Sequence, residues 1–63
     1  MLKKAIDIDT NDHVLIGNTH WEVWDCWGDW DKKVMKIFLI YEEGWESRRK
    51  KLEVPFDEEL QVV

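Results

Sequence analysis

The sequence has only one cysteine and one proline, and it lacks any long apolar run. A single cysteine, Cys26, excludes a disulfide within the chain, so packing must stabilise this small protein. The longest apolar stretch, residues 34–41, is interrupted by Lys36 and is too short to cross a bilayer. The N-terminus turns acidic at Asp7 before an apolar signal sequence develops. We therefore expect a cytoplasmic protein with no membrane partner, in keeping with the lone thiol.

Positive charge is scarce in the first half of the chain. Residues 1–31 carry two bases and seven acids, a net charge of −5, whereas residues 32–63 carry seven of each. An acidic field favours basic partners and disfavours nonspecific binding to a nucleic-acid backbone.

Large aromatic side chains are abundant in this short chain. A chain of 63 residues forms one domain at most and buries only roughly 60% of the surface that it exposes when unfolded. Each buried aromatic ring adds about 150–250 Å² of buried area, and the sequence has five tryptophans. Part of the tryptophan content is therefore expected in the core, and we assign Trp21 to it.

Turn residues and β-branched runs divide the chain into short strands rather than helices. Gly17–Asn18 is suited to a tight turn with positive φ, and Pro55 is expected to end a strand. The strands are predicted at residues 13–16, 19–26, 33–42, 45–54 and 61–63, with a loop at 28–32, a turn at 43–44 and a single helical or 3₁₀ turn at 56–60.

This order predicts an all-β protein, a small antiparallel barrel of about five strands with a one-turn helix before the last strand. Over residues 13–63 the layout resembles SH3-like and Tudor-like barrels, but no motif of those families is present, so no functional residue follows from the resemblance. The alternative is an open antiparallel sheet completed by dimerisation. Residues 1–12 are expected to form an N-terminal arm that is either frayed or an added strand.

The pairing of the central strands can also be predicted. A hairpin centred near Trp30 places Trp21 opposite Leu39 and Val23 opposite Ile37, which forms a core face. On the other face, Glu22 then pairs with Phe38 and Trp24 pairs with Lys36. A slip of one residue would exchange the two faces.

Four tryptophans recur at every third residue between positions 21 and 30, separated by acids. A helix would spread these rings around half of its circumference, and Gly28 disfavours one. Exposed tryptophans beside carboxylates attract basic side chains and are typical of binding hot spots. The predicted partner-binding residues are Trp24, Asp25, Trp27, Asp29, Trp30 and Asp31. The alternative is that the loop rings fold back over the open end of the barrel.

A second candidate surface is the only basic run, Arg48, Arg49, Lys50 and Lys51. In a strand these four side chains alternate between faces, which fits an edge strand or a protruding hairpin but not a central strand. The run is interpreted either as protection of an edge against aggregation or as a nucleic-acid site. The nucleic-acid site requires Trp24, Trp27 or Trp45 beside the bases as stacking platforms.

Residues for catalysis or metal binding are poorly arranged in the sequence. The spacing of His13, His20 and Cys26 is not that of a zinc site, and nothing around Cys26 suggests an activated nucleophile. We predict no enzyme activity, no cofactor and no metal.

The sequence therefore predicts a binding module or a small acidic inhibitor that engages a basic surface on a partner protein. The alternatives are a nucleic-acid-binding module that uses residues 48–51 and a structural subunit of a larger assembly, including a homodimer.

Overall fold

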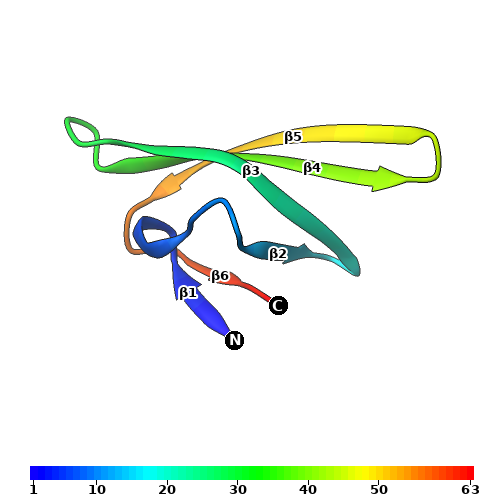
Figure 1. The fold of residues 1–63 in the computed structure, drawn as a ribbon. Helices are drawn as coiled ribbons and strands as arrows, with labels where there is room; N and C mark the ends of the chain where they lie inside the picture. The colour runs from blue at the N-terminus through cyan, green and yellow to red at the C-terminus, as the bar shows by residue number, and fades with distance from the viewer.

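The computed structural model describes residues 1–63 as an all-β protein. Its elements are β1 (Leu2–Lys4), a 3₁₀ turn η1 (Ala5–Asp7), β2 (His13–Ile16), β3 (Thr19–Asp29), β4 (Val34–Glu43), β5 (Glu46–Pro55) and β6 (Glu59–Gln61). Strands β2, β3, β4 and β5 form an antiparallel sheet in this order, and β1 pairs with β6 in a second, smaller sheet. Figure 1 shows β1, β6 and η1 on one side of the β3–β4–β5 layer, with nothing on its other side.

The predicted strands at 13–16 and 33–42 and the turn at Gly17–Asn18 are confirmed, and β4 is central as expected. Gly17 has a φ of 61°, a conformation that is readily adopted only by glycine. Two predictions near the C-terminus are wrong. The last strand, predicted at 61–63, is β6 at Glu59–Gln61. The helical turn at 56–60 is a hydrogen-bonded turn, in which the Glu58 amide donates to the Pro55 carbonyl, and the chain's one 3₁₀ turn lies at Ala5–Asp7 instead.

The predicted loop at 28–32 also begins too early. Gly28 and Asp29 belong to β3 and pair with Met35 and Val34, so the loop covers only residues 30–33. Gly28 is accommodated in the strand because its missing side chain leaves room for Phe56, whose ring carbon lies 3.3 Å from where a Cβ would be. The glycine therefore marks a close approach between chain segments rather than a turn.

The core lies between the four-stranded sheet and the N- and C-terminal segments. It contains eight buried side chains, Ala5, Ile8, Val14, Val23, Met35, Ile37, Leu39 and Val62. On β4 the buried positions alternate with half-buried ones, as expected for a sheet with one covered face. We call the covered side of this sheet the core face and the opposite side the outer face. Trp21 packs against the core but is only half-buried, so it lies at the margin of the core.

The two sheets meet where Val62 bridges to Val14 of β2, and the opposite edge, β5, has β4 as its only neighbour. The strands thus form a four-stranded meander with a small sheet beneath it. The β4–β5 ladder continues to Glu43 opposite Glu46, whereas β3 leaves β4 after Ile40. The end of the β4–β5 hairpin therefore projects beyond the rest of the fold (Figure 1).

The predicted pairing of β3 with β4 is wrong by two to three residues. Val23 lies opposite Leu39 rather than Ile37, and Glu22 lies opposite Ile40. The pairing then shifts between Val23 and Asp25, which makes Trp24 the extra residue of a β-bulge. Simple alternation cannot predict such an inserted residue, although it assigned Val23, Ile37 and Leu39 correctly to the core face.

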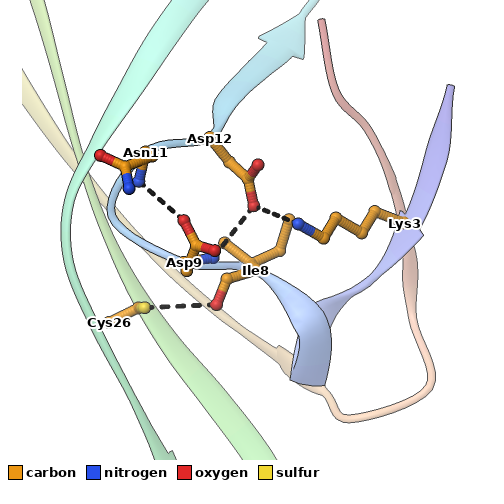
Figure 2. Close-up of polar contacts among 6 residues, drawn as sticks. All are labelled: Lys3, Ile8, Asp9, Asn11, Asp12 and Cys26. Atoms are coloured by element: carbon orange, nitrogen blue, oxygen red, sulfur yellow. Dashed lines mark hydrogen bonds and ion pairs between the residues drawn. The ribbon is translucent and has the colours of Figure 1, made fainter.

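A cluster of polar contacts attaches residues 8–12 to the rest of the fold (Figure 2). The Asp12 carboxylate accepts hydrogen bonds from Lys3 Nζ at 2.8 Å and from the Asp9 amide at 3.0 Å. Asp9 in turn accepts a hydrogen bond from the Asn11 amide, a local pattern typical of turns. The Cys26 thiol donates to the Ile8 carbonyl oxygen at 3.5 Å. This segment is thereby held across β3 and against β1.

Candidate protein-interaction surface

The outer face carries a cluster of three aromatic rings, which we call the aromatic cluster: Trp24, Trp27 and Phe38. The Phe38 ring centroid lies 5.7 Å from that of Trp24 and 4.7 Å from that of Trp27. The two tryptophans are 46% and 48% exposed. No element covers them, because the remaining strands pack on the opposite side of the sheet.

The bulge explains why two tryptophans three residues apart share one face. In a regular strand, Trp24 and Trp27 would point to opposite sides of the sheet. The extra residue at Trp24 changes the alternation, so that Cys26 and Gly28 lie opposite Ile37 and Met35 on the core face. Trp27, opposite Lys36, then joins Trp24 on the outer face.

Two bases from β5 lie against this cluster. The Arg49 guanidinium carbon lies 5.5 Å from the Trp24 ring centroid, and Lys51 Nζ lies 5.9 Å from that of Phe38. Cations at these distances are attracted to the ring faces. Trp24, Phe38, Arg49 and Lys51 line a shallow hollow of about 260 Å³, which Lys50 also touches from its place between the two bases in the strand. The hollow thus combines an apolar floor with a positively charged rim.

The other two bases of the run face the core side of the sheet. Lys50 Nζ lies 5.9 Å from the Trp21 ring, and Arg48 pairs with Tyr41, whose ring is 5.7 Å from that of Trp21. All four bases are exposed, and none forms a salt bridge; the structure's ion pair joins Lys3 to Asp12.

The acids predicted to bind a partner lie on the β3 side of the surface and in the turn that follows. Asp25 accepts a hydrogen bond from the Cys26 amide and Asp29 accepts one from the Lys32 amide, so both have local structural roles. Asp31 is exposed in the turn after β3. On β3, Asp25 lies opposite Phe38 and Asp29 opposite Val34, so these acids share a strand with the two tryptophans, whereas the bases lie on β5.

Trp30 is separate from the aromatic cluster. Its ring contacts Phe56 edge-on with a centroid distance of 4.7 Å, and it is 69% exposed. It therefore folds back over the end of the sheet, as in the alternative prediction for the loop rings. The structure brings Trp24 and Trp27 together with Arg49 and Lys51, but it does not bring Trp30 or Asp31 to them.

Two exposed or half-exposed aromatic residues were not among the predicted partner-binding residues. The predicted pairing placed Phe38 on the face opposite the core, and Lys36 on the same face was the signal that this side is open. Trp45 is 97% exposed at the end of the β4–β5 hairpin, where Gly44 provides the positive φ of the turn. On the same hairpin, the Tyr41 hydroxyl donates a hydrogen bond to Glu43, which raises the pKa of that tyrosine.

The Cys26 thiol is partly buried on the core face. Burial, followed by the negative charge of Asp25, raises its pKa above the ordinary value, so the thiol is held in its unreactive form. His, Cys, Asp and Glu side chains form no group of three or more that could hold a metal ion.

No protein-family model, curated protein or solved structure matches the chain. None of its helices has the length and apolar character needed to cross a membrane.

Proposed function

We propose that the protein is a non-enzymatic protein-binding module whose contact surface is the outer face of β3, β4 and β5. The observation that carries this proposal is the uncovered aromatic cluster with Arg49 beside it. Tryptophan and arginine are the side chains most enriched at the energetic centres of protein interfaces. Contiguous exposed rings are also uncommon on a surface that has no partner.

The charge pattern supports a partner of mixed character. Acids on the β3 side fit the basic partner surface predicted from the sequence, whereas Arg49 and Lys51 on the β5 side fit acidic side chains. Complementary charge of this kind increases association rates and selects the orientation of binding. A small acidic inhibitor is one form of such a module, supported by the net charge of −5.

A second candidate function is the binding of single-stranded nucleic acid on the same face. The contact of Arg49 with Trp24 and of Lys51 with Phe38 favours it, because stacked bases and neutralised phosphates require rings and cations side by side. The acids on β3 and the net charge oppose it.

The SH3-like or Tudor-like barrel also remains a proposal. It is supported by the four-stranded antiparallel meander and the short final strand.

The test is affinity capture from a lysate of the source cells with the wild-type protein and a Trp24→Ser/Trp27→Ser double variant. We expect a specific partner to be retained by the wild type and lost with the double variant, because the rings are the anchors. Trp45→Ser is the matched control, since it removes an exposed ring outside the cluster and should retain the partner. Circular dichroism should show that all three proteins are folded.

Equal retention by the double variant and the wild type would refute the aromatic cluster as the contact surface. Titration with an oligothymidylate at two salt concentrations separates the second candidate. Strong quenching of tryptophan fluorescence that weakens steeply with salt would favour nucleic acid.

A further inference from the structure

The outer edge of β5 is a long row of backbone groups without a partner in the chain. β5 covers ten residues, Glu46–Pro55, and pairs only with β4. The backbone hydrogen bonds outside the regular ladders involve none of residues 46–54 on this edge. Every side chain from Glu46 to Lys51 is exposed. Such an edge can accept another strand.

The charges on this edge select the kind of strand that can be added. Arg48 to Lys51 lie opposite Tyr41, Ile40, Leu39 and Phe38 of β4, which are uncharged, and no acid forms a salt bridge with any of the four bases. Two of the bases project to each face of the sheet. Cross-strand pairs of opposite charge stabilise a sheet and pairs of like charge destabilise it.

A second β5 strand centred on the same basic run does not fit the edge. Two β5 strands paired antiparallel about the middle of the run would place Arg48 opposite Lys51 and Arg49 opposite Lys50, so that every pair is repulsive. An acidic strand, in contrast, meets a base at each of these positions, whichever face its side chain takes. The hollow lined by Trp24, Phe38 and the bases lies on the outer face and includes residues of β5 itself.

We infer that β5 is the site at which an extended, acidic segment of a partner protein is added to the four-stranded sheet as a fifth strand. Backbone pairing supplies affinity in this mode of recognition, and side-chain positions supply specificity. The inference rests on the proposed function, because it specifies which part of a partner protein the module binds. It differs from a purely protective role of the bases, which requires no ligand.

The probe is a short synthetic peptide with a run of glutamates flanked by valines, titrated against the full chain by fluorescence polarisation. Two further peptides carry backbone N-methyl groups on alternate residues, one on the odd set and one on the even set. In an added strand only one of these sets points its N–H groups at β5. We expect one N-methylated peptide to lose at least about tenfold in affinity and the other to bind nearly as well as the parent peptide.

Protein variants test the charges on the two faces separately. Arg49→Glu/Lys51→Glu changes the outer face and Arg48→Glu/Lys50→Glu changes the core side, and we expect each pair to weaken binding by about tenfold or more. Lys4→Glu/Lys32→Glu is the matched control, because it makes the same change in net charge at exposed positions away from β5. Amide hydrogen exchange should slow along β5 when the parent peptide is bound.

Three results would overturn the inference. Absence of peptide binding would leave the bases as protection of the edge. Equal effects of the two N-methylated sets, or dependence on Arg49 and Lys51 alone, would mean that an acidic ligand lies on the outer face without pairing to β5. Tighter, salt-sensitive binding of a matched oligothymidylate would assign the bases to nucleic acid. The capture test with the Trp24→Ser/Trp27→Ser variant is independent of these three results, so the proposed function and this inference can fail separately.

Discussion

Leu39 and Phe38 are neighbours in β4 that should respond to mutation in opposite ways. Leu39 is fully buried on the core face, whereas Phe38 lies half-buried on the outer face between two tryptophan rings. We expect Leu39→Ala to affect folding and Phe38→Thr to affect the proposed binding.

The size of the Leu39 effect follows from its burial. Replacing a fully buried leucine by alanine lowers the free energy of unfolding by about 2–5 kcal/mol, depending on how far the cavity collapses. A chain of this length has a total stability of about 3–9 kcal/mol. Because only eight residues are buried, we expect the total stability to lie in the lower part of its range. Leu39→Ala should therefore lose most or all of its stability and be partly or wholly unfolded at 25 °C.

Phe38→Thr should lower the free energy of unfolding by only about 1 kcal/mol, because part of the ring remains in solvent and threonine suits a strand. Urea unfolding followed by far-UV circular dichroism measures both changes. The reasoning is refuted if Phe38→Thr unfolds the protein while Leu39→Ala does not, since the two faces of β4 would then be exchanged. Partner capture with Phe38→Thr completes the comparison, and we expect it to be weakened.

Three titratable groups give further predictions. Burial favours a higher pKa for Asp12, but hydrogen bonds from Lys3 and the Asp9 amide outweigh it and lower the pKa, so this carboxylate stabilises the fold above its ordinary pKa. The stability difference between wild type and Asp12→Asn, measured by urea unfolding, should be largest near neutral pH and should shrink below about pH 4. A difference that grows toward acid would contradict this sign. The hydrogen bond to Asp12 raises the pKa of Lys3, so the same contribution should also fade in strong alkali. The raised pKa of Cys26 predicts slow alkylation by iodoacetamide at pH 8 in the folded protein and fast alkylation in urea. Equal rates in both states would show that the thiol is not protected.

The strand content of the fold and the core side of β4 could be predicted from local patterns. The apolar, β-rich composition of residues 33–42 and the β-rich run at 13–16 indicate strands directly, and Gly17–Asn18 indicates a tight turn. The same local reasoning failed at 56–60, where acids typical of a first helical turn surround a turn without a helix. It failed at Gly28 as well, because nothing local reveals that Phe56 approaches this glycine.

The candidate site, too, could be predicted from the sequence only in part. Residue types predicted two surfaces, an acidic and aromatic one at 24–31 and a basic one at 48–51, and both sets were named from the sequence. Only the pairing of β3, β4 and β5 shows that Trp24 and Trp27 share a face with Arg49 and Lys51. The cause is a single inserted residue at Trp24, which changes the alternation of the rest of β3. A strand's side-chain period is a local property readable from sequence, but a bulge and a register arise from contacts between distant segments, and therefore only the tertiary structure decides them.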